Sequence, residues 1–298
     1  MKHIDLGKSG LVASAISLGC MRINRLAERE LDQLISKALE VGINFFDHAD
    51  VYGGGACEEL FAVSLGRLSV AREEVILQSK CGIRQGMYDF SQEHILAAVE
   101  GSLSRLKTDY LDVLLLHRPD ALMEPEEVAI AFSKLQESGK VRHFGVSNMN
   151  PGQIELLRRF VDQKMVANQL QLSLTNTGMI DSGLNVNMQI DRSLDRDGGI
   201  LEYCRLNDIT IQPWSPFQFG FFEGVFLDND KFPELNRVVN ALAEEKGVTN
   251  TAIAIAWLLR HPAEMQPIVG TTNAGRLSDI AQATEVALSR QEWYALYM

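Results

Sequence analysis

Short runs of β-branched and aliphatic residues alternate along the chain with longer segments in which apolar residues recur every three or four positions. The short runs are typical of buried parallel strands, and the longer spacing is typical of helices that pack one face on a sheet. We predict strands at 15–19, 44–48, 75–80, 111–117, 141–147, 166–171, 210–215 and 266–270. We predict helices at 27–40, 58–68, 91–106, 125–138, 151–160 and 273–284. This alternation predicts successive βαβ units.

Repeated βαβ units place the chain in the α/β class. Eight strands with helices between them favour a closed (β/α)8 TIM barrel over an open, doubly wound sheet. The start signals of the helices agree with this assignment, because Ser91 can cap one helix and Pro125 and Pro151 stand where a helix can begin without losing a needed N–H.

Three segments depart from the simple alternation. The first twelve residues hold the turn-like Gly7-Lys8-Ser9-Gly10 between two short extended stretches, which predicts a β-hairpin that caps one end of the barrel. The polar stretch 173–199 is long for a barrel connection and is typical of a functional or mobile loop. The segment 216–230 combines five Phe with two Gly, so its aromatic rings either line a pocket or form a local hydrophobic plug.

Composition limits the classes of function. The 298 residues show no internal repeat, linker or low-complexity tract, so we predict one domain over 1–298. A net charge of −11 disfavours nucleic acid as a partner, although a local basic pocket for one phosphate stays possible. The four cysteines have neither disulfide-framework nor zinc-site spacing, and no metal site is predicted.

Targeting signals are also missing from the sequence. No cationic segment followed by an apolar run opens the chain, and no stretch approaches the ~18 apolar residues that a membrane span needs. We therefore expect a cytoplasmic protein without membrane partners, and a monomer in preference to an oligomer.

Ionisable side chains gather where three successive predicted strands end. Asp47, Lys80 and His117 each close a largely apolar run, where a lone charge is costly unless it is paired. Barrel enzymes place their active sites at the carboxyl ends of the strands. Asp47 and Lys80 would most simply pair with each other, and the ammonium would lower the pKa of Tyr52, which follows Asp47 by five residues, so that its phenol can act as a general acid. His117 would then orient a substrate oxygen or assist the path of the proton.

Each of these side chains also has an ordinary structural explanation. Asp47 and Lys80 can form a purely structural ion pair. Tyr52 can pack at the rim of the barrel, and His117 can be a satisfied core residue. The combination of the four, and no single member, indicates an active site.

The motifs around these residues resemble the aldo-keto reductase family over nearly the whole chain. GINFFDHADVYGGG at 42–55 matches the segment that carries the family's Asp and Tyr, and Glu58 stands in the acidic position that usually follows. The match continues with SKCG at 79–82, DYLDVLLLHRPD at 109–120 and GKVRHFGVSN at 139–148. The chain is particularly similar to a bacterial subgroup of largely unassigned oxidoreductases that carry His, here His48, after the Asp.

The resemblance implies a role for each matching residue. Tyr52 would be the proton donor, Lys80 and Asp47 the pair that lowers its pKa, and His117 the group that orients the substrate. Ser147, Asn148 and Gln169 would bind the nicotinamide carboxamide, and Trp214 would stack on the nicotinamide ring. The full implied cofactor set is Gly19, Cys20, Met21, Asp47, Ser147, Asn148, Gln169, Trp214, Ser215, Pro216, Phe217, Gln218, Gly220, Gly270, Thr271, Thr272, Asn273, Arg276 and Asp279.

The phosphate end of this set departs from the family pattern. Gly270 and Ile280 stand where members commonly carry a Lys and an Asn. Hydroxyl and N–H groups at 271–273 can still hold a phosphate, and Arg276 would contact an adenosine 2'-phosphate. The resemblance therefore implies NADP(H) as the cofactor, in preference to NAD(H).

The expected reaction is the reduction of an aldehyde or ketone by direct hydride transfer, which makes the chain an NADP-dependent aldo-keto oxidoreductase with a small-molecule carbonyl substrate. One alternative is a cofactor-binding, redox-sensing or regulatory subunit similar to the potassium-channel β subunits. Another is a lyase or isomerase that uses Lys80 as a Schiff base, which the acidic partner of Lys80 disfavours. The phenylalanines of 216–230 hint at an apolar or aromatic carbonyl compound, and the sequence specifies the natural substrate no further.

Overall fold

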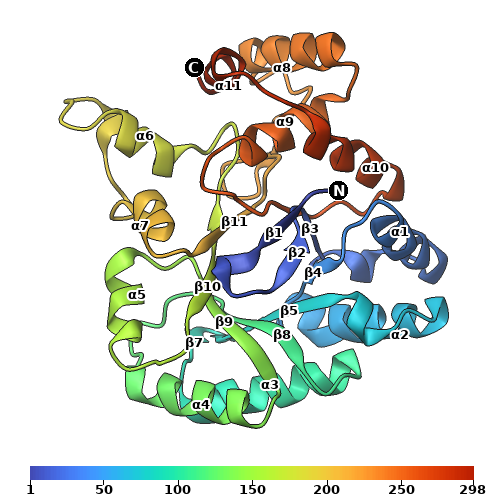
Figure 1. The fold of residues 1–298 in the computed structure, drawn as a ribbon, viewed down its shortest axis with the longest axis vertical. Helices are drawn as coiled ribbons and strands as arrows, with labels where there is room; N and C mark the ends of the chain where they lie inside the picture. Colours follow the sequence, from blue (N-terminus) through green and yellow to red (C-terminus); the bar gives the residue numbers. More distant parts are fainter.

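Eight parallel strands form the centre of the molecule, which the computed structural model describes for residues 1–298 (Figure 1). Their order in the sheet is β11-β10-β9-β8-β5-β4-β3-β14. The strands are β3 Ser17–Gly19, β4 Phe45–Asp47, β5 Ile76–Cys81, β8 Leu111–Leu116, β9 Val141–Ser147, β10 Met165–Gln171, β11 Thr210–Trp214 and β14 Ile268–Val269. Each coincides with a predicted strand to within a few residues at its ends, so the predicted (β/α)8 TIM barrel is confirmed.

The two ends of this sheet meet and nearly close the barrel. The backbone N–H of Gln266, just before β14, donates to the carbonyl oxygen of Ile211 in β11 at 3.0 Å. Inside the barrel the Gln212 side chain donates to that of Gln266 at 2.8 Å. The seam is therefore joined by single hydrogen bonds rather than by a continuous ladder.

Helices cover the outside of the sheet, and six of them follow the predicted segments. These are α1 Glu28–Glu40, α2 Ala56–Leu68, α3 Gln92–Leu106, α4 Pro125–Glu137, α5 Pro151–Arg158 and α10 Ala274–Gln282. The start signals behave as expected, since the Ser91 hydroxyl accepts from the backbone of His94 and both Pro125 and Pro151 begin a helix.

Other helices were not predicted from the apolar spacing. They are α6 Gly178–Leu184, α7 Ile200–Leu206, α8 Pro233–Lys246, α9 Asn250–Leu259 and α11 Arg290–Tyr297. The structure also contains the short 3-10 helices η1 Leu6–Lys8, η2 Ile23–Arg25, η3 Tyr52–Gly55, η4 Arg72–Glu74, η5 Asp191–Ser193 and η6 Ala283–Glu285. In Figure 1, α8, α9 and α11 lie together at one end of the view. None of the helices combines the length and the apolar composition needed to cross a membrane.

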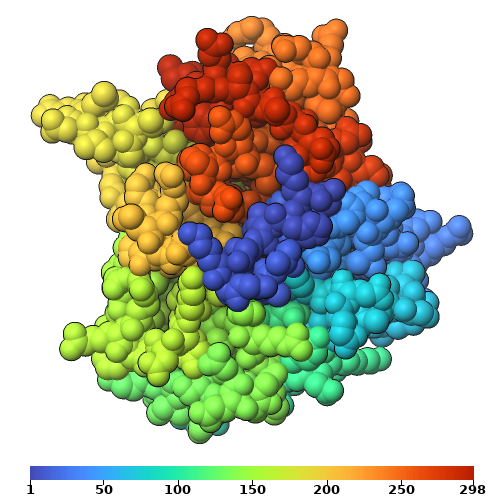
Figure 2. Space-filling model, viewed as in Figure 1, coloured from blue at the N-terminus to red at the C-terminus, as the bar shows by residue number.

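The predicted N-terminal cap is present as an antiparallel hairpin of β1 (His3–Asp5) and β2 (Val12–Ser14). Leu6 is fully buried against a cluster that includes Phe45, the first residue of β4. Gly7 has a φ of 60°, and a Cβ atom there would lie 2.5 Å from the carbonyl oxygen of Val166, so only glycine fits. The hairpin therefore plugs the end where the strands begin, and its residues, blue in Figure 2, sit at the middle of the face shown there.

The two irregular segments hold small elements of their own. Residues 173–199 contain α6 and η5, and residues 216–230 contain a hairpin of β12 (Gln218–Phe219) and β13 (Gly224–Val225). A third hairpin, β6 (Ile83–Arg84) with β7 (Met87–Tyr88), follows β5. Composition thus marked 173–199 and 216–230 as connections, but it did not reveal the short elements inside them or the hairpin after β5.

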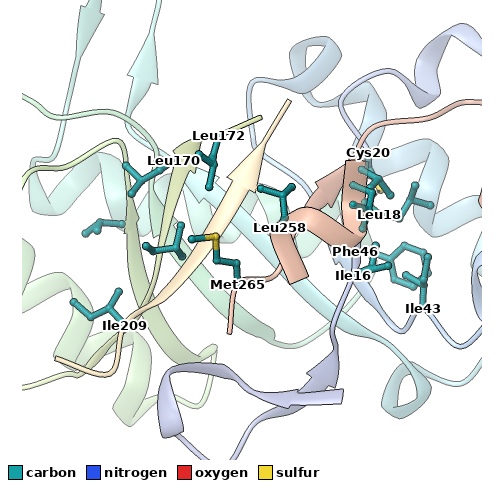
Figure 3. Packing of buried hydrophobic residues seen from close by; sticks show 14 of the residues in the cluster. Ile16, Leu18, Cys20, Ile43, Phe46, Leu170, Leu172, Ile209, Leu258 and Met265 are labelled. Carbon is teal, nitrogen blue, oxygen red and sulfur yellow. Dashed lines mark hydrogen bonds between the residues drawn. The ribbon is translucent and has the colours of Figure 1, made fainter. Parts of the chain in front are cut away.

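Most of the hydrophobic core lies between the sheet and its helices. Figure 3 shows Ile16 and Leu18 of the β3 region beside Phe46 of β4, with Leu258 of α9 farther along the same cluster. All four side chains are buried. This layer packs against the strands from outside. Inside the barrel lie a smaller apolar cluster, which contains Leu6 and Phe45, and polar side chains toward the carboxyl ends of the strands.

Candidate active site

A buried lysine organises the carboxyl ends of β4 and β5. Lys80 Nζ donates to Asp47 Oδ2 at 2.8 Å, to the His48 carbonyl oxygen at 2.7 Å and to the Tyr52 hydroxyl at 3.0 Å. β4 and β5 are neighbours in the sheet, where Asp47 pairs with Gln78, and Lys80 lies two residues farther along β5 on the same face. All three ammonium protons therefore have an acceptor, and the charge is compensated although the lysine is completely buried.

A tight turn brings Tyr52 back over this pair. Tyr52 begins η3, and the three glycines after it, Gly53, Gly54 and Gly55, have φ values of 61°, 64° and 96°. Residues with a Cβ atom rarely adopt these values, so the GGG sequence is what allows the turn. The tyrosine ring packs edge-on against the His117 ring, with 5.8 Å between the ring centroids. Four predicted catalytic residues thus meet at one point.

Burial and the neighbouring charges set the protonation of this cluster. Burial alone would lower the pKa of Lys80, but Asp47 and then Tyr52 outweigh it, and the pKa is raised. Burial lowers the pKa of His117 well below its usual range, with Lys80 and Arg118 acting in the same direction. The site therefore holds a charged lysine beside a neutral imidazole at neutral pH.

The expected lowering of the Tyr52 pKa was wrong. Burial is the largest influence and raises this pKa; Lys80 lowers it, as expected, whereas Asp47 raises it. The sequence showed the ammonium but not the degree of burial of the phenol. Tyr52 is consequently protonated at neutral pH, which is the state that a proton donor needs.

Four glutamines inside the barrel support the carboxylate of Asp47. Its Oδ1 accepts from Gln78 Nε2 at 2.6 Å and from Gln169 Nε2 at 3.1 Å. Both of these amides also donate to Gln212 Oε1, and Gln212 donates in turn to Gln266. All four glutamines are buried, so this network fills the polar layer of the barrel and holds Asp47 in place.

The side chain of His48, the residue after Asp47, points away from the catalytic cluster and toward Phe61. Its ring is completely buried and packs edge-on against Phe61, with 4.6 Å between centroids. Neither ring nitrogen has a hydrogen-bond partner, and burial lowers its pKa to about 3. Only the carbonyl oxygen of His48 therefore belongs to the site.

A cavity of about 690 Å³ opens above these residues at the carboxyl ends of the strands. Three of the four predicted catalytic residues, Asp47, Tyr52 and His117, line it, and Lys80 lies behind them. The predicted cofactor residues that line it are Gly19, Met21, Asp47, Ser147, Asn148, Gln169, Trp214, Ser215, Pro216, Phe217, Gln218, Gly270, Thr271, Thr272, Asn273, Arg276 and Asp279.

Two predicted cofactor residues are not brought to this cavity. Cys20 is buried in the core, and the Gly220 carbonyl instead accepts a hydrogen bond from the Gln171 side chain at 2.7 Å. The cavity wall also contains residues that the sequence did not single out as cofactor contacts: Arg22, Ile83, Arg118, Phe221, Phe222, Val225, Leu227, Asp228, Thr249, Asn250, Thr251, Ile268 and Ile280. Arg22 directly follows Met21, and Arg118 directly follows His117. This proximity in sequence to predicted site residues is the one feature that could have indicated them as cavity residues.

An aromatic and amide platform forms one wall of the cavity. Trp214, the last residue of β11, donates from Nε1 to Asn148 Oδ1 at 3.1 Å, and Asn148 Nδ2 donates to Ser147 Oγ at 2.7 Å. Phe222 stacks on Trp214 with 5.9 Å between centroids. Both protons of Gln169 Nε2 have acceptors inside the barrel, which leaves its Oε1 as the free polar atom of that side chain.

The far end of the cavity lies at the start of α10. Asn273 caps this helix by accepting from the Gly275 backbone at 2.9 Å, and Thr271 accepts from the Asn273 backbone at 3.1 Å. Arg276 in the first turn is exposed and forms no ion pair in the structure. This end therefore offers backbone and hydroxyl donors with one free positive charge, a combination suited to a phosphate group.

Comparison with known proteins agrees with this geometry. The model of the Aldo/keto reductase family matches residues 15–297. The chain therefore belongs to the aldo/keto reductase family, as its motifs predicted.

Individual relatives match over almost their whole length. The chain is 37% identical to the uncharacterized oxidoreductase YcsN of Bacillus subtilis, over 100% of this chain and 97% of that protein. It is 34% identical to a 6-dehydroglucose reductase of Novosphingobium aromaticivorans, over 98% of this chain and 93% of that protein. The crystal structure of the thermostable aldo-keto reductase Tm1743 with the inhibitor epalrestat matches with a TM-score of 0.82 at 26% identity, covering 100% of this chain and 99% of that one. Family and relatives together support oxidoreductase activity on carbonyl compounds.

Proposed function

We propose that this protein reduces an aldehyde or ketone to an alcohol with NADPH, and that Tyr52 supplies the proton. The observation that carries the proposal is the Tyr52 hydroxyl, which lines the cavity while it accepts a hydrogen bond from the buried Lys80 at 3.0 Å. A phenol in contact with an ammonium can give up its proton as negative charge develops on the substrate oxygen, because the lysine stabilises the phenolate that forms.

The other members of the cluster act on the same oxygen. His117 is neutral at neutral pH, so it can donate a hydrogen bond to the carbonyl without adding a competing positive charge. Asp47, held by Gln78 and Gln169, keeps Lys80 charged. Preorganised donors of this kind stabilise developing negative charge without reorganising during the reaction.

The residues of the cavity fit a nicotinamide dinucleotide. A bound reduced nicotinamide would supply the hydride for the carbonyl carbon. Trp214 offers an indole face, while Ser147, Asn148 and the free Oε1 of Gln169 offer partners for an amide. The exposed Arg276 at the far end favours NADPH over NADH, because a 2'-phosphate would satisfy its unpaired charge.

The buried state of Lys80 argues against Schiff-base chemistry. An amine must lose its proton to attack a carbonyl carbon. The pKa of Lys80 is raised, and each of its three ammonium N–H groups donates a hydrogen bond within the protein. The proposed role of Lys80 is therefore electrostatic.

The protein is expected to work as a single domain and a monomer in the cytoplasm, as the sequence predicted.

The direct test is a fluorescence titration of the purified protein with NADPH and NADH, followed by the absorbance of the reduced cofactor after adding carbonyl compounds. The panel pairs an aromatic aldehyde such as benzaldehyde, suggested by Phe221 and Phe222 at the cavity, with 6-dehydroglucose, suggested by the named relative. Binding with oxidation of the cofactor supports the proposal. Tight binding without oxidation of the cofactor by any carbonyl would favour a regulatory, cofactor-sensing role, and a lack of binding would contradict both functions.

A further inference from the structure

Arg22 is a charged side chain in the cavity wall for which the catalytic cluster gives no role. It lies between the end of β3 and η2 and is half-buried. Its pKa is lowered by burial and by the nearby Arg25, and no carboxylate counters this. Its side chain makes one hydrogen bond, in which Nη2 donates to the Gly270 carbonyl oxygen at 2.6 Å. A guanidinium has five donors, so most of its hydrogen-bonding capacity is unused at this site.

Gly270 provides the space that Arg22 occupies. A Cβ atom at position 270 would lie 3.1 Å from Arg22 Nη2, closer than an ordinary contact. The φ of Gly270 is outside the left-handed region, so the backbone itself does not demand glycine. The two residues are 248 positions apart in the sequence and meet just after the neighbouring strands β3 and β14. The bare glycine therefore lets a guanidinium that follows the neighbouring strand β3 reach this point of the cavity.

The position of Arg22 within the cavity indicates which ligand group it meets. Gly19 and Met21, just before it in the chain, line the cavity together with Asp47 of the catalytic cluster. On its other side, Gly270 is followed directly by the phosphate-suited segment that starts at Thr271. Arg22 thus follows closely on Gly19, the register partner of Asp47, and contacts the last residue before the phosphate-suited segment. The middle of a nicotinamide dinucleotide is its pyrophosphate, a dianion whose oxygens match the fork of a guanidinium.

We propose that Arg22, seated against Gly270, binds the pyrophosphate of the nicotinamide dinucleotide and is the main cationic contact to that group. The inference rests on the proposed function, because it assigns a residue to the cofactor named there. Arg22 follows β3, whereas the phosphate-suited segment follows the neighbouring strand β14, so the cofactor would be held by the loops after both strands.

The first test compares Arg22→Met with the wild type by fluorescence titration. We expect the Kd values of NADPH and NADH to rise by the same factor, about 10- to 100-fold, because both cofactors contain the pyrophosphate and a charged hydrogen bond of ordinary strength is lost. Arg25→Met, at an exposed position one helical turn away, is the matched control and should leave both Kd values unchanged. Equal melting temperatures of the two variants would show that both are folded.

The second test moves the positive charge from position 22 to position 270. Gly270→Lys alone should weaken binding, because its side chain would collide with Arg22 Nη2. In Arg22→Ala this space is free, so the double variant Arg22→Ala/Gly270→Lys should recover most of the lost affinity, whereas Arg22→Ala alone should not. The recovered binding should weaken with added salt, as expected for a phosphate contact.

Specific outcomes overturn the inference. If the wild type binds and oxidises NADPH but Arg22→Met has unchanged Kd values, the role of Arg22 is overturned and the proposed function stays intact. A loss confined to NADPH would place Arg22 at the 2'-phosphate and overturn the pyrophosphate assignment. A wild type that binds neither cofactor would overturn both proposals.

Discussion

The Nζ atom of Lys80 lies 2.8 Å from Asp47 Oδ2, and the two side chains are almost completely buried. Two charges in such a place are tolerated only because they compensate each other and because every remaining donor and acceptor finds a partner. Removing one partner leaves the other charge buried and uncompensated, whereas removing both charges leaves no uncompensated charge in the interior.

This relationship predicts a non-additive effect on stability. Lys80→Met should lower the free energy of unfolding by about 3–5 kcal/mol, because Asp47 then carries an uncompensated buried charge. Adding Asp47→Asn to Lys80→Met should recover a large part of that loss. Urea unfolding of the wild type, both single variants and the double variant measures the coupling, and additive losses would contradict a compensated pair.

The proton-donor role of Tyr52 predicts a selective loss of turnover. Tyr52→Phe keeps the ring against His117 but removes the hydroxyl, so kcat should fall by about 100- to 10,000-fold. The Kd of NADPH should stay within a small factor of the wild-type value, because the phenol contributes to the reaction rather than to cofactor binding. Tyr88→Phe, on the exposed β7, is the matched control, and equal activity of both variants would remove Tyr52 from the mechanism.

The glutamine network predicts that Gln78 matters for both stability and rate. Gln78→Leu fills a similar space but deprives Asp47 and Gln212 of a donor, which should cost about 1–3 kcal/mol of folding free energy. Because Asp47 would be less firmly held, kcat should also fall while the Kd of NADPH changes little. Leucine at the exposed Gln282 serves as the control for the substitution itself. Unaltered stability in Gln78→Leu would mean that the network does not support the site.

Asp50 predicts a specific pH dependence of stability. Burial, and next the nearby Glu58, raise the pKa of Asp50 to about 7 from its ordinary value of 3.8, although the Val51 backbone N–H, Arg105 and Lys80 act in the opposite direction. Its Oδ1 atom is buried without a partner. Between these two pKa values the native state keeps a proton that the unfolded chain has released, so raising the pH through this window removes stability until the folded group also ionises.

Asp50→Asn should remove this penalty, because the amide resembles the protonated carboxyl and never ionises. We expect the variant to be more stable than the wild type by about 2–4 kcal/mol at about pH 8 and nearly equal to it at about pH 4. Urea unfolding over this range is the measurement. A stability difference that does not change with pH would show that Asp50 does not titrate in this window.

The sequence revealed most of the barrel because the strands are short, apolar and separated by amphipathic helices. α9 was missed since its residues, NTAIAIAWLL, are apolar on nearly every side and seven consecutive residues are buried, so no periodic pattern remains. α6 and α7 were missed because seven-residue helices have too few turns for a pattern to appear. These elements exist because tertiary packing covers them.

The four proposed catalytic residues could be found from the sequence because each ends or follows a strand, and a parallel barrel brings strand ends together whatever the details of packing. The sequence by itself therefore determined the order of the strands, the edge at which Asp47, Lys80 and His117 meet, and the glycines that turn Tyr52 toward them. Only the tertiary structure decided the direction of the Tyr52 pKa, because burial depends on atoms from many elements. It alone also brought Gln78 to Gln212 and Arg22 to Gly270, contacts that span 134 and 248 residues and follow no local pattern.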